Sequence, residues 1–296
     1  MTKIGLAALL FAACASAPPR PTPAAPTSAA GVAAAMALRA DAEAAYNARD
    51  YPRCADLFAK AGRAQPEKAD VDGYSAACCF ALAGDGASAF AQLDQALASG
   101  LRARADLEGD TDLASLRADP RWAKVLGGAT ANAEAYYRGA NPELRSIHDA
   151  DQADRRAGPG AINWAEVGPR DVARRRRVTE ILDGGGAHVS VDFFHAAMVF
   201  QHGEEVADYR RAHELAVRAA ELDPRNQSAR WLAAAAKDRE LMKLGQPQLY
   251  GTQFRKVGDV WELYQTDPTV TDDERARWNV PPIAEARRRA ERMNKR

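Results

Sequence analysis

The sequence is poor in aromatic residues and has no excess charge of either sign. Only 7% of its 296 residues are Phe, Trp or Tyr, and 40 basic residues balance 40 acidic ones. The formal net charge of zero gives no overall attraction to nucleic acid, so we expect no nucleic-acid partner. No run of about 20 apolar residues occurs either, which excludes a membrane-spanning helix in the mature chain.

Cysteine and histidine are also scarce, with four and five residues respectively. They show neither paired zinc-binding cysteines nor an HExxH pattern, so we expect no metal site and no cofactor. Three cysteines follow the N-terminal region: Cys54, Cys78 and Cys79. We favour small buried core residues for these three, and a disulfide from Cys54 to Cys78 or Cys79 is the alternative.

Alanine is the most frequent hydrophobic residue, and runs of β-branched residues are few. Small side chains of high helix propensity favour closely packed helices, so we expect a mainly α fold. One short β-hairpin is expected near residues 252–264, where apolar residues alternate around Gly258-Asp259. In the second half, helices are predicted over residues 142–156, from about 171, and over 189–203, 208–223, 226–244, 272–278 and 283–293.

The N-terminus carries the pattern of an export signal. Lys3 precedes an apolar run that reaches Cys14, and Phe11-Ala12-Ala13-Cys14 resembles the bacterial lipobox, in which the cysteine becomes lipid-modified. Residues 1–14 are therefore predicted to be a lipoprotein signal peptide. The Pro- and Ala-rich residues 15–31 are predicted to be a tether.

A lipid on Cys14 would anchor the protein in the bacterial cell envelope, with the membrane as one partner and the folded part facing the periplasm or the exterior. Two alternatives stay open. Cleavage after Ala15-Ser16-Ala17 would give a secreted protein, and a chain without a functional signal would stay in the cytoplasm.

A 35-residue repeat occupies residues 32–126, where Asp50-Tyr51 is echoed by Gly84-Asp85. This period indicates pairs of helices stacked in a solenoid, and the apolar positions match the packing positions of tetratricopeptide repeats. Either the repeats bind a protein or peptide partner, or they only support the packing of the rest. The matching residues are Leu38, Ala42, Ala45, Phe58, Ala61, Ala77, Phe80, Ala89, Leu93 and Ala96.

Residues 127–140 are predicted to link the repeats to a second helical domain, residues 141–296. Four short motifs that combine charged and amide side chains follow one another in that domain. A carboxylate buried among apolar residues needs a partner, so we expect the motifs to meet in space. The motif residues are Asp151, Gln152, Arg155, Gln201, His202, Asp238, Arg239, Gln248, Tyr250, Thr252 and Gln253.

The order DQxxR, QH, DR and YGTQ resembles that of a bacterial family known only as a domain of unknown function. The resemblance covers about residues 141–292 and includes an arginine before a Pro-containing C-terminal helix, which is Arg275 or Arg277 here. It implies that a site lies among the motif residues and the loop from Gly245 to Arg255. It implies no particular reaction.

Two functional interpretations follow for this site. In an enzyme, His202 would act as general acid or base, Asp151 or Asp238 would orient it, and Arg155 or Arg239 would contact an anion. In a binding or scaffolding module, the same side chains would satisfy one another as a polar network. We favour the second interpretation because the sequence offers no clear nucleophile, metal set or cofactor loop.

Overall fold

The computed structural model describes residues 27–156 and 158–295. The predicted signal peptide, Cys14 and most of the tether lie outside these residues. Within them the fold is mainly α with one two-stranded antiparallel sheet, as predicted. Among the helices that the structure describes, none is both long and apolar enough to cross a membrane.

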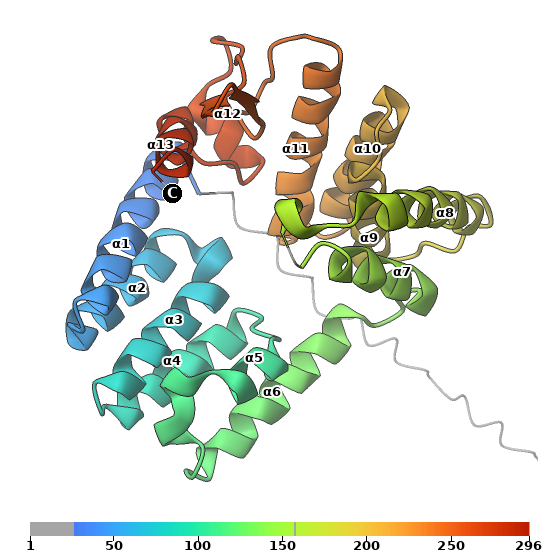
Figure 1. Cartoon of the computed structure of the whole chain (residues 1–296). Helices are drawn as coiled ribbons and strands as arrows, with labels where there is room; N and C mark the ends of the chain where they lie inside the picture. The colour runs from blue at the N-terminus through green and yellow to red at the C-terminus, as the bar shows by residue number, and fades with distance from the viewer. Residues whose placement is uncertain (1–26, 157, 296) are drawn as a thin grey trace, which may run out of the picture.

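The repeat region begins with four helices packed in sequence order, α1 (Ala29–Asn47), α2 (Tyr51–Ala64), α3 (Ala69–Leu82) and α4 (Gly86–Ala98), which stack side by side in Figure 1. The 35-residue echo has a local cause. Asp50 and Asp85 are the N-caps of α2 and α4, and each side chain accepts a hydrogen bond from the backbone N–H three residues later. The residue before each cap has a positive φ, 60° at Arg49 and 80° at Gly84, which turns the chain between paired helices.

The repeat region continues through η1 (Pro66–Lys68), α5 (Arg104–Gly109), η2 (Thr111–Leu116) and α6 (Arg121–Tyr136). Leu93, Leu107, Leu113 and Trp122 share one buried cluster, which closes the core of this part. The predicted domain boundary between residues 126 and 127 falls inside α6, which runs from the repeats towards the second part of the chain (Figure 1).

A disulfide joins Cys54 of α2 to Cys79 of α3, and Cys78 is free and buried. The alternative of a disulfide therefore holds for Cys54 and Cys79, and the expectation of a small buried core residue holds for Cys78. Successive helical residues point in different directions, so only one of the neighbouring cysteines can face α2. An ion pair also joins these helices: Arg39 of α1, which is partly exposed, donates to the buried carboxylate of Asp72 in α3 through two nitrogens, at 2.7 and 2.8 Å.

The second part packs α7 (Pro142–Ala153), η3 (Pro159–Ala161), α8 (Trp164–Asp183), α9 (Ser190–Gln201), α10 (Val206–Leu222) and α11 (Gln227–Lys243) around one apolar core. Helix α8 begins seven residues before the predicted start near Asp171. It continues through Pro169, whose missing N–H forgoes one backbone hydrogen bond. The other predicted helices of this part agree with the observed ones to within a few residues.

The C-terminal elements fold back on the chain. Strands β1 (Phe254–Val257) and β2 (Val260–Leu263) pair with Val257 opposite Val260, so Gly258-Asp259 forms the two-residue turn. Two short helices follow, α12 (Asp272–Arg277) and α13 (Ile283–Met293). The backbone N–H of Ala29 in α1 donates to Asp273 of α12, so the two ends of the described chain meet, as Figure 1 shows.

Candidate functional site

The first two motifs meet around Asp151, whose carboxylate is fully buried near the end of α7. Its Oδ1 accepts from Arg155 Nη1 at 3.0 Å, and its Oδ2 accepts from Gln152 Nε2 at 2.8 Å. The same Oδ2 lies 2.8 Å from Nδ1 of His202, which is the C-cap of α9. Every residue of the DQxxR and QH motifs except Gln201 therefore touches this carboxylate.

Two further residues belong to this cluster, and sequence reasoning missed both. Asp171 of α8 accepts hydrogen bonds from Arg155 and, at 2.9 Å, from Arg174 Nη1. Arg174 also donates to Asp154 at 2.6 Å. The pKa of Arg174 is raised, because these hydrogen bonds outweigh the opposing effect of burial. An i, i+3 spacing of Asp171 and Arg174 was the available signal.

The run of four arginines in α8 is largely taken up by such pairs. Arg177 forms ion pairs with Glu143 of α7 and with Glu180, while Arg175 lies 3.6 Å from Asp208. These guanidinium groups face carboxylates of the same part of the molecule. These ion pairs leave no concentrated basic face among the described residues of α8.

The last two motifs meet around Asp238, which is fully buried in α11. Its Oδ1 accepts from the backbone N–H of Leu249 at 2.8 Å and of Tyr250 at 2.9 Å, and its Oδ2 accepts from the N–H and hydroxyl of Thr252 at 2.9 and 2.8 Å. Burial raises the pKa of Asp238, and the four hydrogen bonds act in the opposite direction. Both oxygens are occupied by the loop, and Asp151 rather than Asp238 contacts His202.

The YGTQ sequence has a role at each position. Tyr250 packs with Ala234 and Val280, and Gly251 has a φ of 84°. This positive φ favours glycine, and a Cβ at this position would also have to displace the terminal methyl of Ile283 in α13, 2.7 Å away. Thr252 binds Asp238, and Gln253 donates to the Ala235 carbonyl at 3.3 Å.

Arg239 connects the two clusters. Its Nη1 donates to the backbone carbonyl of Gln201 at 2.8 Å, and its Nε donates to Gln253 Oε1 at 3.3 Å. Gln201 precedes His202, so the chain from Asp151 to Asp238 is one continuous set of contacts. Burial lowers the pKa of Arg239, and among the described residues no carboxylate lies within ion-pair distance of it.

Gln248 and Arg275 hold the loop from the other side. Gln248 is fully buried and donates to the carbonyls of Gln253 and Tyr264, at 3.0 and 2.9 Å, while its Oε1 accepts from the N–H of Gln253. Arg275 donates to the carbonyls of Tyr250 and Leu249. Of the two arginines left open by the sequence, Arg275 is thus the one at the site, and Arg277 is exposed.

His195 of α9 is buried, and its Nδ1 has no hydrogen-bond partner among the described residues. Its ring stacks on His148 with 4.2 Å between the centroids. Burial, with a smaller contribution from His148, lowers the pKa of His195 to about 3. The charge of Asp149 raises the pKa of His195, and the charge of Arg145 lowers it.

We expect His195 to make folding stability depend on acidity. Between pH 6.5 and 3 the unfolded chain binds a proton at this residue that the folded chain does not, so stability falls as the pH falls, by about 1.4 kcal/mol per unit for one proton. His195→Leu should flatten this slope in urea unfolding measured from pH 7 to pH 4. His188→Gln, which removes an exposed histidine, is the control, and equal slopes for wild type and His195→Leu would contradict the assignment.

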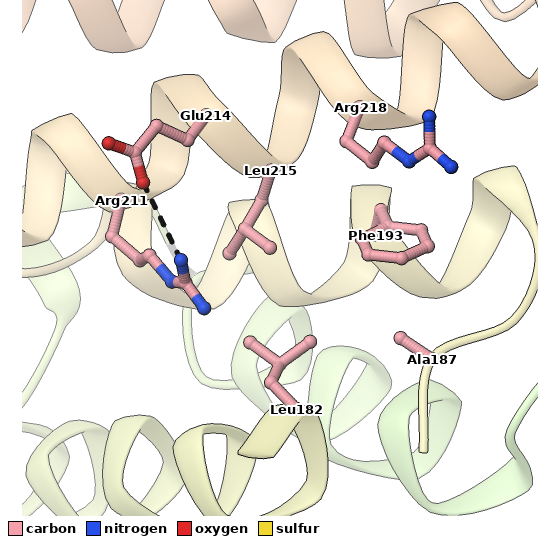
Figure 2. A pocket seen from close by; sticks show the side chains of 7 residues that line it. All are labelled: Leu182, Ala187, Phe193, Arg211, Glu214, Leu215 and Arg218. Carbon is pink, nitrogen blue, oxygen red and sulfur yellow. Dashed lines mark ion pairs between the residues drawn. The ribbon is translucent and has the colours of Figure 1, made fainter. Parts of the chain in front are cut away.

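Two cavities lie away from the motif residues. One, of about 250 Å³, opens between the end of α8, α9 and α10; Figure 2 shows Leu182, Phe193 and Leu215 pointing into it and the ion pair of Arg211 with Glu214 at its edge. The other, of about 450 Å³, lies in the repeat region between α1, α2, α3 and η2, and we call it the repeat groove. The repeat groove is lined by Glu43, Tyr46, Asn47, Phe58, Tyr74, Ser75, Cys78, Cys79, Asp110 and Asp112.

The geometry of the motif residues is compatible with one catalytic role and one structural role. The Asp151 carboxylate can hold the His202 imidazole in one orientation, which is the arrangement of a general base. The contacts of Asp238, Gln248 and Gln253 instead fix a loop against α11. Comparison of the chain with protein-family models, with curated proteins and with solved structures gives no match.

Proposed function

We infer that this protein is a binding or scaffolding module of the bacterial cell envelope, in which the repeat region holds a partner protein or peptide. The observation that supports this function is the repeat groove, a cavity of about 450 Å³ between α1, α2, α3 and η2. Stacked helical repeats bind extended segments on such inner faces. The motif residues of the second part then serve as a polar network that stabilises the domain.

The contact of Asp151 with His202 favours an enzyme as the second candidate function. The distance of 2.8 Å between Oδ2 and Nδ1 and the 19% exposure of the His202 side chain would let Nε2 exchange a proton with a bound molecule. Hydrolysis by acid and base catalysis is the reaction type that such a pair would support. Asp238 takes no part in this candidate because the loop occupies its carboxylate.

A blocked groove tests the binding function. Asn47 is exposed at the end of α1 and lines the repeat groove, so Asn47→Trp should fill its mouth without disturbing the core. A displayed library of random peptides selected on the full chain should yield a consensus that binds the wild type and loses at least about tenfold in affinity for Asn47→Trp. Gln95→Trp, on an exposed position of α4, is the matched control. Selection of no consensus would contradict the function.

The envelope location rests on the sequence alone and has its own test. Cys14→Ser removes the only sulfur that the lipobox offers for lipid, so the variant should move from the membrane fraction to the soluble fraction. Mass spectrometry of the N-terminal peptide from the wild type should show an acylated cysteine. Recovery of the wild type with an unmodified N-terminus at Pro18 would support the secreted alternative.

A further inference from the structure

The repeat groove has an unusual balance of charge. Among the described residues that line it, three carry carboxylates, Glu43, Asp110 and Asp112, and none is Lys, Arg or His. In the part of the chain that the structure describes, none of these carboxylates has a basic side chain within 4.0 Å, whereas the buried carboxylates of Asp72, Asp151 and Glu240 each do. The cavity of the second part differs, because Arg211 and Arg218 line it beside Glu214.

Hydrogen bonds hold two of these carboxylates in place. Asp110 accepts from the hydroxyl of Tyr74 at 2.5 Å and from the backbone N–H of Asp112 at 2.9 Å, and Asp112 accepts from the hydroxyl of Tyr46 at 2.8 Å. Burial opposes ionisation of Asp110, but these donors and the charge of Arg117, whose Nη2 donates to the backbone carbonyl of Asp110 at 2.7 Å, hold the pKa of Asp110 below the usual value. Oδ1 of Asp112 has no donor among the described side chains and remains available to a ligand.

The neighbouring groups stay neutral and supply aromatic surface. The hydrogen bond to Asp112, followed by burial, raises the pKa of Tyr46 to about 12. Burial and Asp110 raise the pKa of Tyr74 and of the Cys78 thiol. The groove thus places carboxyl groups beside the rings of Tyr46, Phe58 and Tyr74, the combination that attracts a cation both by charge and by its contact with aromatic faces.

We propose that the repeat groove binds the basic side chain, lysine or arginine, of a partner peptide. The proposal rests on the inferred binding function and specifies the chemistry of the partner. The groove of about 450 Å³ accommodates an extended aliphatic stem, which the rings would cover, while the ammonium or guanidinium reaches the carboxylates. A bare divalent cation is the rival occupant, since Cys78, Asp110 and Asp112 each offer a ligand atom within 4.8 Å of the others.

The test compares peptides that differ in one side chain. Alanine-based hexapeptides with a central lysine, arginine, norleucine or glutamate are titrated into the full chain and followed by NMR shifts and calorimetry. We expect the lysine and arginine peptides to bind at least about tenfold more tightly than the norleucine peptide, which has the same stem without the charge. Binding should shift the resonances of Tyr46, Phe58 and Tyr74.

Paired variants connect the binding to the groove. Glu43→Gln with Asp112→Asn should abolish the preference for lysine over norleucine, and it preserves an acceptor for Tyr46. Asp94→Asn, an exposed change on α4, should leave the preference intact. Thermal unfolding of each variant confirms that it is folded.

Each outcome has one meaning. Equal affinity for lysine and norleucine peptides, or a preference for glutamate, would overturn the proposed chemistry while leaving the binding function intact. No binding of any hexapeptide, together with no consensus from the peptide library, would overturn both. Saturable binding of Mn²⁺ or Zn²⁺ that the Asp112→Asn change removes, with no peptide preference, would identify a metal site and overturn the proposal.

Discussion

Asp238→Ala is expected to lower the free energy of unfolding by about 3–5 kcal/mol, because it removes a buried acceptor of four hydrogen bonds. The N–H groups of Leu249, Tyr250 and Thr252 would lose their partner, and the N–H of Tyr250 is buried. Each unsatisfied buried donor costs about 1–3 kcal/mol, and the loop can regain only part of this by moving towards solvent.

The same substitution should loosen a defined segment before the whole protein unfolds. Gln248 and Arg275 also hold the loop. If the loop detaches from α11, its hydrogen bonds with Gln248 and with Arg275 of α12 should become exposed to solvent. Hydrogen exchange of the amides at 248–254 should therefore accelerate in Asp238→Ala at urea concentrations where α9 and α10 stay protected. Lys243→Ala, an exposed change on the same helix, is the control.

Asp238→Asn separates charge from acceptor geometry. The amide keeps one oxygen for the N–H groups of Leu249 and Tyr250, but its NH₂ faces the N–H of Thr252, where two donors would meet. We expect Asp238→Asn to lower the free energy of unfolding by more than Lys243→Ala does and by less than Asp238→Ala does. A free energy of unfolding for Asp238→Ala within about 1 kcal/mol of the wild type would contradict a structural role for this carboxylate.

The sequence was informative where a pattern has one local cause. Capping by Asp50 and Asp85 accounts for the repeat period, and Gly258-Asp259 accounts for the turn of the hairpin, so both could be predicted from neighbouring residues. The convergence of the four motifs was also predictable, because buried carboxylates need partners. In the structure the first two motifs meet where Asp151 contacts His202, and the last two meet where Asp238 accepts from Thr252.

The remaining features depend on residues far apart in the sequence. The choice of Cys79 over Cys78 follows from which side of α3 faces α2. The contact of Asp171 with Arg155 requires the packing of α7 against α8, and the repeat groove requires η2 to lie beside α1 and α3. The periodicity of a single helix does not show which other helix it will pack against. Neither the repeat groove nor the carboxylates gathered in it could therefore be predicted from the sequence.

Asp151→Ala is the second substitution with a large expected effect, about 3 kcal/mol of unfolding free energy. It would leave the imidazole of His202 and the amide of Gln152 without their acceptor. Arg155 would keep its hydrogen bond to Asp171, which is why we expect a smaller cost than for Asp238→Ala. Urea unfolding of Asp151→Ala, with Ser146→Ala as the exposed control on the same helix, measures this cost.

A double-mutant cycle with His202→Ala decides between the two candidate roles of the pair. His202→Ala alone should cost about 1 kcal/mol, because the ring is partly exposed and loses one hydrogen bond. If the pair belongs to a structural network, Asp151→Ala and His202→Ala should show a coupling energy of about 1 kcal/mol. A His202→Ala variant as stable as the wild type, with coupling below about 0.5 kcal/mol, would remove the structural role and favour His202 as a catalytic group. Loss of turnover of a substrate by that variant, with its fold unchanged, would then identify the enzyme.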